Sequence, residues 1–501
     1  MQIDLTLVID IGKSHAKLLM VDAVGQVLER HDRDNAPVVS PLGYPALDID
    51  GLMQWMCETL AASVATQRCA RAIVSTHGAA LVALGDGALN PTVAWAPIDY
   101  EFEDCTQTGS AQDMDYCNAC DPFIDTLSPD LPMGLNAARQ LYWMQHTHPK
   151  AWAATQTLLP YPQYWAWWLS GVASTEISSL GCHTQLWLPA QRGYSKLAQS
   201  QGWADLFAPL RAAGEVLGSV RPSLADALGL PRHCQVHVGV HDSNACLARY
   251  LKPQDKESSH PNDQASLTLI SSGTWTVIMA PGADSHELAA ERDMLGNVNV
   301  LGQPTPTARF MGGREFAYLL DGAASDAGSD EDVRSLVQTN TLALPSFAPQ
   351  GGPFRQQAGE VLRDGNPLPL QQLPDSQRSA LSALYCAQVT AWLVQKLRPE
   401  LLIALDPNAP TSVHTAAAQP LIVVEGPLAS NHLYLSLLQA LLPASDCRVS
   451  VDTLEGTARG AWLLAVGAAS ASASDNFLNT VPRCNWPGLA NYQMQWQQHL
   501  I

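Results

Sequence analysis

Residues 5–19 read Leu5-Thr6-Leu7-Val8-Ile9-Asp10-Ile11-Gly12-Lys13-Ser14-His15-Ala16-Lys17-Leu18-Leu19. Residues 267–278 read Leu267-Thr268-Leu269-Ile270-Ser271-Ser272-Gly273-Thr274-Trp275-Thr276-Val277-Ile278. Each stretch is an apolar strand, a tight glycine-centred turn rich in hydroxyl groups, and a second apolar strand. The backbone N–H groups of such a turn point outward and form a nest for phosphate oxygens. Two copies in one chain predict two related halves that hold one polyphosphate between them.

The composition indicates a globular chain that does not bind polyanionic surfaces. The chain has 501 residues, 47% of them hydrophobic and 15% charged, and a formal net charge of −19. This length predicts two domains of roughly 250 residues each. The acidic balance argues against nucleic acid and anionic membrane as partners, because both require clustered lysine and arginine. It is compatible with a nucleotide, whose phosphates backbone amides, a few lysines and Mg²⁺ can hold locally.

The sequence predicts a cytoplasmic protein. Residues 1–4 lack the basic segment of a secretory signal and lead directly into an apolar strand. No run of 18 apolar residues is present that could span a bilayer. The eleven cysteines include one close pair, Cys117 and Cys120, without further ligands at the spacing of a zinc site. We therefore expect reduced thiols.

Strands and helices alternate along both halves, which predicts an α/β protein with helices packed on mixed sheets. Helical periodicity is found near residues 52–64, 134–147 and 161–169, and apolar strands at 72–75 and 236–240. The polar, turn-rich residues 251–264 precede the second hairpin, and we expect them to link a domain of residues 1–250 to one of residues 265–501. Residues 407–419 are expected to form a surface loop.

The first turn carries the groups that a phosphate site needs. Asp10 ends a strand and can orient a water bound to Mg²⁺. Gly12 lets the backbone turn closely around a ligand, and Lys13, Ser14 and Lys17 offer two cations and a hydroxyl. An ordinary hairpin explains this turn alone. The second turn, with the same chemistry, favours the functional interpretation.

Asp242 follows an apolar strand and precedes a helix. It can cap that helix, or it can accept the proton of a hydroxyl that attacks a phosphate. The two roles are compatible, because the helix dipole favours the carboxylate.

Two further segments combine a strand or helix with small residues. Residues 421–427 are a strand that runs into a glycine turn at Gly426, and a polar cluster at residues 430–432 follows. Residues 455–461 begin a helix with small side chains. Small residues let a purine lie against the backbone, and they equally allow close packing of two helices.

These segments together resemble the FGGY family of carbohydrate kinases nearly from end to end. Asp10-Ile11-Gly12 through Lys17 is similar to the family's first phosphate motif, and Ser271-Ser272-Gly273-Thr274-Trp275 to its second. Residues 239–245 resemble the catalytic segment, Gly426 and Asn431 match the adenosine motif, and Gly312-Gly313 falls at the family's glycine pair.

The resemblance implies ATP- and Mg²⁺-dependent phosphorylation of a sugar, usually a ketose or polyol. It also implies an α/β fold of two ribonuclease-H-like (actin-like ATPase) domains, with mixed sheets flanked by helices and a cleft between them. It makes Asp242 the catalytic base and places Mg²⁺ at Asp10 and Asp242. The residues implied to bind ATP and its phosphates are Gly12, Lys13, Ser14, Lys17, Ser272, Gly273, Thr274, Gly313, Gly426 and Asn431.

On the sugar side the resemblance covers His77, Gly78, Asp99 and His241. His77-Gly78 resembles a substrate-contacting pair of xylulokinase-like members, although a lone histidine at a strand end is commonly just hydrogen-bonded or solvated. Asp99 lies where relatives carry Trp-x-Asp-x-Arg, but here the arginine is missing.

Two further segments of the sequence bear on the predicted sugar site. The tryptophans of residues 165–168 could line the sugar pocket or pack in the core. Residues 175–179 occupy a family position near the substrate.

The predicted partner is a small sugar, and two rival functions share the fold: a catalytically silent sugar sensor and a sugar-independent ATPase. Ser-Ser-Gly-Thr-Trp favours a deoxy-ketohexose such as rhamnulose or fuculose, whereas His-Gly favours a ketopentose such as xylulose or ribulose. A homodimer is the default expectation for such an enzyme.

Overall fold

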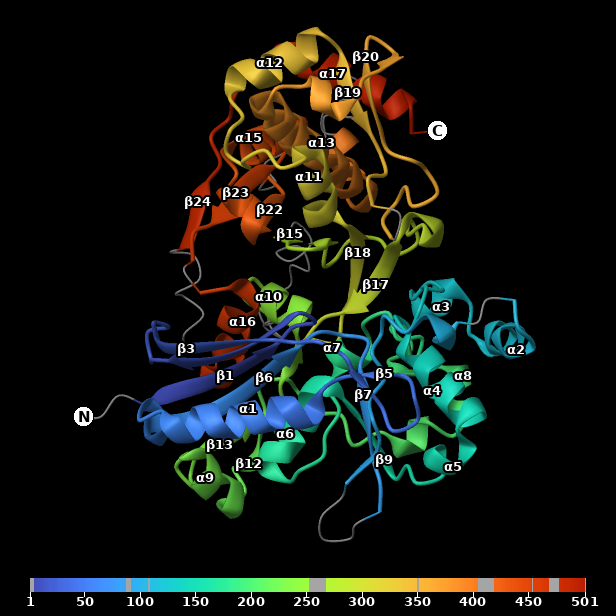
Figure 1. Ribbon diagram of the computed structural model, residues 1–501, viewed down its shortest axis with the longest axis vertical. Coiled ribbons are helices and arrows are strands. Elements are labelled where there is room, and N and C mark those ends of the chain that lie inside the picture. Colours follow the sequence, from blue (N-terminus) through green and yellow to red (C-terminus); the bar gives the residue numbers. More distant parts are fainter. Residues whose placement is uncertain are drawn as a thin grey trace, which may run out of the picture. The chain divides into compact units, whose positions relative to one another are not determined.

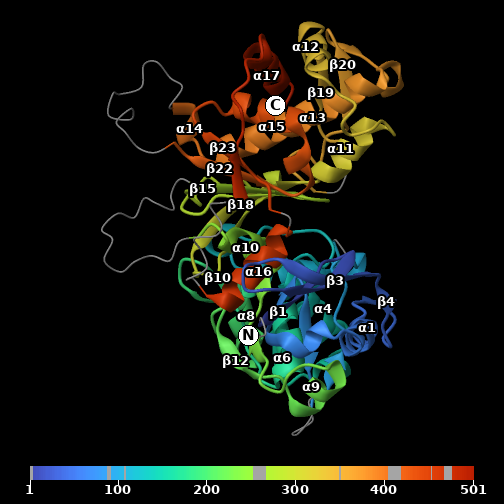
Figure 2. The same ribbon diagram turned by 90° about the vertical axis from the view of Figure 1, so that its left-hand side faces the viewer.

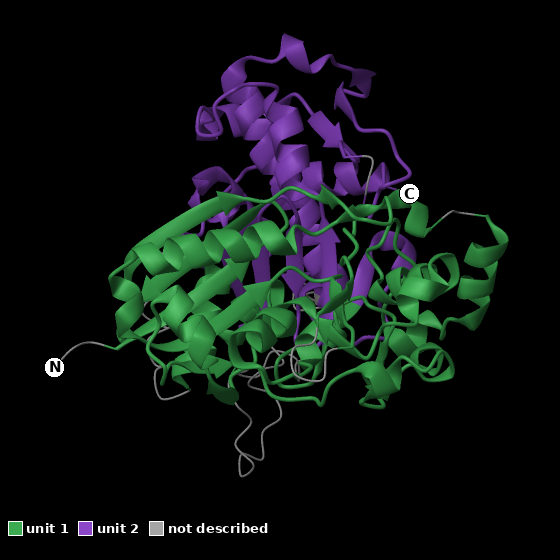
Figure 3. Ribbon diagram, turned by 60° about the horizontal axis from the view of Figure 1, so that its bottom comes forward, with its two compact units in different colours: residues 1–253, 296–304, 453–474 green, residues 254–295, 305–452, 475–501 purple. Residues whose placement is uncertain are grey.

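The computed structural model describes residues 4–86, 92–106, 109–251, 267–348, 351–403, 419–452, 454–467 and 477–500. The chain forms two compact units, shown in different colours in Figure 3. Unit 1 comprises residues 1–253, 296–304 and 453–474, and unit 2 comprises residues 254–295, 305–452 and 475–501.

This division differs from a single cut at a linker. Residues 296–304 and 453–474 belong to unit 1, although both lie beyond the expected first domain of residues 1–250. Apart from Leu251, the expected linker lies outside the described residues, as does the expected loop of residues 407–419 apart from Gln419.

Unit 1 is built on a seven-stranded mixed sheet with the order β12-β13-β6-β1-β2-β3, in which β14 also pairs with β6. Its strands are β1 (Leu5–Ile11), β2 (His15–Val21), β3 (Val27–Asp34), β6 (Cys69–Thr76), β12 (Val216–Ser219), β13 (Gln235–His237) and β14 (Val240–His241). Strands β1, β2 and β3 are successively antiparallel. Strand β6 runs parallel to β1, β13 and β14 run parallel to β6, and β12 is antiparallel to β13.

The sheet of unit 2 repeats the order and direction of five of these strands, β3-β2-β1-β6-β13, as β18-β16-β15-β22-β23. Its sheet has the order β17-β18-β16-β15-β22-β23-β24. The strands are β15 (Leu267–Ser272), β16 (Thr276–Met279), β17 (Met294–Val298), β18 (Pro304–Phe310), β22 (Leu421–Glu425), β23 (Asp446–Ser450) and β24 (Leu478–Thr480). Strands β15, β16 and β18 are antiparallel, β22 and β23 are parallel to β15, and β24 is antiparallel again. The two quoted hairpins are therefore β1–β2 and β15–β16, and the prediction of two related α/β halves is confirmed.

Strand β1 shows how the sheet of unit 1 is covered on both faces. All seven of its residues are buried, as expected of a central strand with helices on either side. Leu5, Leu7 and Ile9 face the core formed by α1 (Ile49–Ala62), α6 (Tyr161–Ser170) and α9 (Pro222–Leu228). Val8 points to the opposite face, toward α10 (Asp242–Ala248) and α16 (Gly456–Val466). The period of two residues along the strand assigns alternate side chains to the two cores.

Helices α10 and α16 lie side by side, as Figures 1 and 2 both show. A Cβ atom at Gly460 of α16 would lie 1.7 Å from the carbonyl oxygen of Ala245 on α10. Close helix packing therefore explains the small residues of segment 455–461, the second of the two interpretations given above.

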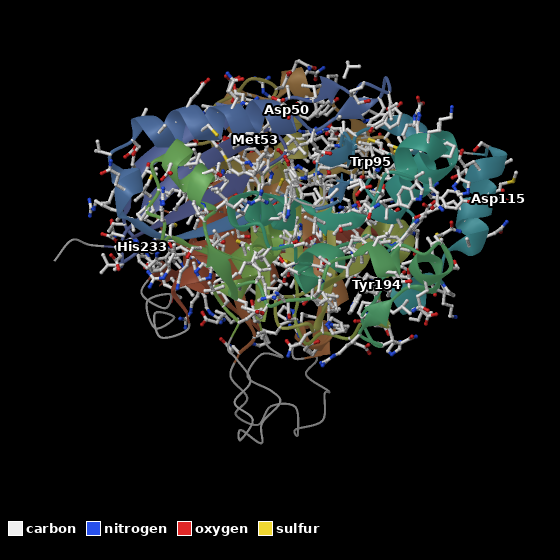
Figure 4. The ribbon with its side chains drawn as sticks, turned by 90° about the horizontal axis from the view of Figure 1, so that it is seen from below. Asp50, Met53, Trp95, Asp115, Tyr194 and His233 are labelled. Atoms are coloured by element: carbon white, nitrogen blue, oxygen red, sulfur yellow. The ribbon has the colours of Figure 1, made fainter. Side chains whose placement is uncertain are left out.

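A third core lies beside this sheet, within unit 1. It is enclosed by α4 (Ala137–Thr147) and by the small sheet β8-β7-β9, formed by β7 (Leu81–Leu84), β8 (Val93–Trp95) and β9 (Thr157–Pro160). Figure 4 labels Trp95 on β8, Tyr194 on the two-residue strand β11 (Gly193–Tyr194), and Asp115 on α2 (Ala111–Ala119).

The helices of unit 2 pack around one long helix. Helix α13 (Asp375–Leu397) contacts α11 (Gly312–Leu320), α12 (Asp330–Gln338) and α15 (His432–Leu441), and most of its side chains are buried. The last helix of the unit is α17 (Leu489–Gln498).

Two local expectations have informative outcomes. The expected strand at residues 236–240 is interrupted, because Gly239 takes a φ of +87° and lies against β6, where a Cβ atom would meet the carbonyl oxygen of Val74 at 2.7 Å. The tryptophans of α6 are buried in the core of unit 1, which confirms the core-packing alternative.

In the described part of the chain, no helix combines the length and the apolar character that a membrane span requires. All eleven cysteines, Cys117 and Cys120 included, are free thiols.

Candidate active site

Three strands of unit 1 bring polar side chains to one edge of its sheet. Asp10 on β1 is in register with Ser75 on β6, and Ser75 is in register with Val240 on β14. Because these strands are parallel, His77 after β6 and Asp242 after β14 emerge at the same edge as Asp10. Electrostatic coupling of Asp242 to both Asp10 and His77 agrees with this placement.

Asp10 is a buried carboxyl group with few partners. The Thr457 hydroxyl donates to Asp10 Oδ2 at 3.2 Å, and the Lys17 ammonium lies 4.0 Å from the same oxygen. Burial raises the pKa of Asp10 to about 7, an effect that Lys17 opposes and that Asp242 and Glu455 reinforce. A carboxyl in this setting has a deficit of positive charge, and a divalent cation would supply it.

Lys17 is shared between two carboxylates. It forms an ion pair with Glu455, which precedes α16, besides its longer contact with Asp10. The sequence interpretation missed Glu455 and Thr457 as neighbours of the first turn, because they belong to a segment more than 400 residues away. The available signal in the sequence was Glu455, an acidic residue that immediately precedes a helix rich in small residues.

Asp242 is the first residue of α10, and His241 is the N-cap, so the capping interpretation of Asp242 does not apply. Its Oδ1 accepts from the Ser243 amide at 2.5 Å and from the Ser243 hydroxyl at 3.2 Å, and it lies 3.1 Å from His241 Nε2. Among the described residues, Oδ2 has no hydrogen-bond partner. Burial raises the pKa of Asp242, and the nearby His77 opposes that rise. The side chain is 27% exposed, so one carboxylate oxygen is committed and the other is free to accept a proton.

Gly78 lies directly against the side chains that flank Asp242. A Cβ atom at this position would be 2.8 Å from Cys182 Sγ and 2.9 Å from His241 Nε2. His77 anchors the same segment, since its amide donates to the carbonyl of Ile11 at 3.0 Å. Burial lowers the pKa of His241 to about 4, so its imidazole is neutral at pH 7.

The first turn is held in shape by its neighbour Asn35. The Asn35 amide donates to the Ser14 carbonyl at 2.8 Å, and its side-chain amide donates to the Gly12 carbonyl at 2.9 Å. The Gly12 amide in turn donates to the carbonyl of His15 at 2.8 Å. The carbonyls of Gly12 and Ser14 therefore both accept hydrogen bonds within the protein. The Ser14 side chain is exposed, so its hydroxyl is accessible to a ligand.

Lys13 points toward the segment that carries Asp99. Its ammonium contacts both oxygens of the buried Asp99 carboxylate and lies 3.6 Å from Glu101. It also lies 4.8 Å from the ring centre of Tyr100, whose ring meets the His77 ring edge-on at 5.5 Å. Lys13, His77 and Asp99 line one small cavity of about 20 Å³. Lys13, which the sequence motif places near the phosphates, therefore contacts residues that were predicted to bind the sugar.

Residues 175–179 have a structural role in the same unit. Glu176 caps the short helix α7 (Ile177–Leu180), accepting from the Ser178 hydroxyl at 2.6 Å and the Ser179 amide at 3.1 Å. Helix α7 packs against β14, so this segment supports the strand that leads to Asp242.

In unit 2 the second turn meets a helix N-terminus. A Cβ atom at Gly313, in the first turn of α11, would lie 2.2 Å from the carbonyl oxygen of Gly273. Only glycine permits this approach. The outward-pointing amides of the turn and the unpaired amides of α11 are thereby brought together, and both kinds of group bind anions. Thr274 is exposed at the tip of the turn.

The other predicted nucleotide residues of unit 2 surround this turn. Gly426 has a φ of +81°, and a Cβ atom there would lie 1.9 Å from the carbonyl oxygen of Ser272. The Ser272 hydroxyl donates to the Glu425 carbonyl at 2.6 Å and accepts from the Leu428 amide at 3.0 Å, so it ties β15 to the turn after β22. Asn431 caps α15 by accepting from the Tyr434 amide at 2.9 Å. Ser272 and Asn431 thus shape the surroundings of the second turn.

Comparison with known proteins agrees with the resemblance to carbohydrate kinases found in the sequence. Residues 264–406 and 408–474 match the family model described as "Carbohydrate kinase FGGY, C-terminal domain". An L-fuculokinase of Salmonella typhi is 24% identical over 294 residues, a match that spans 56% of this chain and 57% of that protein.

Solved structures match over the whole chain. A carbohydrate kinase from Novosphingobium aromaticivorans is 30% identical, with a TM-score of 0.79 over 100% of this chain and 99% of its own. A xylulose kinase from Lactobacillus acidophilus, 13% identical, shares the fold with a TM-score of 0.72 over 99% of this chain and 97% of its own. The two expected actin-like α/β halves are confirmed, and the chain belongs to the FGGY family of carbohydrate kinases.

Proposed function

We propose that this protein transfers the γ-phosphate of ATP to a hydroxyl group of a neutral ketose, with Asp242 as the general base. The observation that carries the proposal is the Asp242 carboxylate, whose Oδ1 accepts two hydrogen bonds from Ser243 while Oδ2 has no partner among the described residues. Such a carboxylate can take the proton of an acceptor hydroxyl, and phosphoryl transfer asks little other covalent work of a protein.

The roles proposed for the remaining residues follow the division into units. In unit 1, His77, Gly78, Asp99 and His241 surround the sugar, and the amides and Ser14 hydroxyl of the first turn contact the transferred phosphate. In unit 2, the turn at Gly273 and the N-terminus of α11 bind the nucleotide phosphates, and Gly426 lies beside the adenosine. Domain closure would exclude water, which competes with the sugar as acceptor.

Mg²⁺ fits the residues around Asp10. Burial raises the pKa of this carboxyl, and the nearby Asp242 adds to the rise. The described residues contain no cluster of three or more His, Cys, Asp or Glu side chains that could hold a metal, so water would fill most of the coordination shell. Mg²⁺ bound there, held by Asp10 and Asp242 through water, would neutralise charge on the phosphates.

The charges around Lys13 favour a neutral sugar over a sugar acid. Lys13 is paired with Asp99 and lies within 4 Å of Glu101, so this group carries a net negative charge. A carboxylate on the substrate would be repelled here. The fuculokinase and xylulose kinase similarities, and the opposing sequence hints, keep a ketopentose and a deoxy-ketohexose as the two candidate classes.

Sugar-dependent release of ADP tests this proposal. With Mg-ATP and a panel of ketopentoses, deoxy-ketohexoses, ketohexoses, polyols and aldonates, we expect one neutral ketose to raise turnover far above a control without sugar. The aldonates should stay at the level of that control. A flat panel with a low background would favour the silent sensor, and a flat panel with a high background would favour an ATPase.

Replacing Lys13 with methionine separates a sugar role from a phosphate role. The change leaves Asp99 buried without its cation and frees the segment that it holds, so we expect the KM for the sugar to rise about tenfold while the KM for ATP is unchanged. Asp99→Asn should act in the same direction, and the double variant should show less than the product of the two effects.

The matched control is Lys196→Met, because Lys196 is exposed in the same unit. If Lys13→Met instead raised the KM for ATP and left that for the sugar alone, Lys13 would be a phosphate ligand, as the sequence motif implies.

A further inference from the structure

The side chain of Asn244 contacts the imidazole of His241, next to Asp242. Asn244 is completely buried on the first turn of α10, and its Nδ2 lies 3.1 Å from Nδ1 of His241. The other imidazole nitrogen, Nε2, lies 3.1 Å from Oδ1 of Asp242. The three side chains form one chain of contacts, from amide to imidazole to carboxylate.

The directions of these hydrogen bonds follow from the donors and acceptors present. An amide NH₂ group only donates, so Nδ1 of His241 must present a lone pair. A neutral imidazole with a lone pair on Nδ1 carries its proton on Nε2. The Nε2–H group then faces the negatively charged Asp242 Oδ1 at 3.1 Å.

The opposite orientation of the amide is electrostatically unfavourable. With the Asn244 oxygen facing His241, the imidazole proton would lie on Nδ1, and the lone pair of Nε2 would face a carboxylate oxygen 3.1 Å away. In the favourable orientation the Asn244 Oδ1 is buried without a partner among the described residues, which costs free energy. A buried asparagine at this position is explained if its amide N–H group donates to Nδ1 of His241.

We propose that Asn244 is a positioning residue, which holds His241 as the Nε2–H tautomer so that its N–H group fixes Asp242 Oδ1 and leaves Oδ2 facing the acceptor hydroxyl. This inference rests on the proposed function for its catalytic consequence. The hydroxyl O–H bond breaks, its proton passes to Asp242 Oδ2, and the oxygen electron pair forms the bond to the γ-phosphorus. The bond between that phosphorus and the bridging oxygen breaks, and ADP leaves with its electron pair.

Nitrogen-15 NMR of histidine-labelled protein tests the tautomer directly, without any substrate. The signal of His241, one of 14 histidines, is assigned by its loss in His241→Gln. We expect Nδ1 to give the signal of an unprotonated nitrogen and Nε2 that of a protonated one. The reverse pattern would overturn the proposal.

Kinetics of two Asn244 variants test the catalytic consequence. Asn244→Leu keeps a similar shape but cannot donate, so we expect kcat to fall at least tenfold, with the KM for sugar and ATP little changed and the His241 signals altered. Asn244→Ala should also lower kcat without a selective change in either KM. The control is Leu247→Val, which removes one buried methylene from the same helix without touching His241.

Each outcome decides the proposal. Full kcat in folded Asn244→Leu would overturn it, as would an equal loss of kcat in Leu247→Val. Should the Asn244 variants fail to fold, the wild-type spectrum still decides the tautomer. If no sugar is phosphorylated by the wild type, the proposed function fails while the tautomer result stands on its own.

Discussion

Replacing Asp242 with asparagine is expected to reduce sugar phosphorylation by about 1,000-fold, within the range that general-base catalysis contributes. The amide oxygen can still accept from the Ser243 amide and hydroxyl, so the side chain keeps its place. It cannot take the proton of the acceptor hydroxyl. Because the proposed nucleotide residues of unit 2 are untouched, the affinity for ATP should stay within a few-fold of the wild type.

The measurement is ADP release at saturating sugar, combined with calorimetric titration of ATP. The matched control is Asp226→Asn, an exposed carboxylate in the same unit whose ion-pair partner in the described part of the chain is the exposed Arg232. It should retain full turnover. Retained turnover in Asp242→Asn would remove Asp242 from the role of the base.

Replacing Gly460 with alanine is expected to have the largest effect on stability. The added Cβ would lie 1.7 Å from the backbone oxygen of Ala245, which cannot rotate away, so α16 must shift from α10. Overpacking of this kind costs roughly 3 kcal/mol. With a change of about 2–4 °C per kcal/mol for a domain of this size, the thermal transition of unit 1 should fall by roughly 6–12 °C.

Differential scanning calorimetry measures this change. The control is Gly193→Ala, also in unit 1, where a new Cβ has only one neighbour at 3.9 Å. That variant should melt within a degree or so of the wild type. A transition unchanged by Gly460→Ala would contradict the close packing of α16 against α10.

The paired hairpins made most of the fold predictable. Apolar strands around glycine turns are encoded locally, so Leu5–Ile11 and Leu267–Ser272 could be identified from residues that are adjacent in the sequence. Their repetition predicted two related halves, and five strands of each sheet share one order and direction. The interruption at Gly239 was not predictable in this way, because its cause is the approach of β6, a strand some 160 residues earlier.

In the candidate site, too, locally encoded features were predictable and long-range contacts were not. Asp10, His77 and Asp242 each end an apolar strand, so their convergence at one sheet edge follows from parallel pairing. The partners of Lys13 and Lys17 did not follow from the sequence. Lys13 is paired with Asp99 and Lys17 with Glu455, and such long-range ion pairs leave no spacing pattern.

The central claim is that Asp242 directs the γ-phosphate of ATP to a sugar hydroxyl, and phosphorus NMR of the reaction products tests it most directly. Wild-type protein is incubated with Mg-ATP and the neutral ketose that raises ADP release, and the phosphorus-containing products are followed with time. We predict that ADP and a sugar phosphomonoester grow in equal amounts, and that Asp242→Asn forms no detectable amount of either over the same time. Growth of ADP with inorganic phosphate instead, or an undiminished phosphomonoester in Asp242→Asn, would contradict the claim.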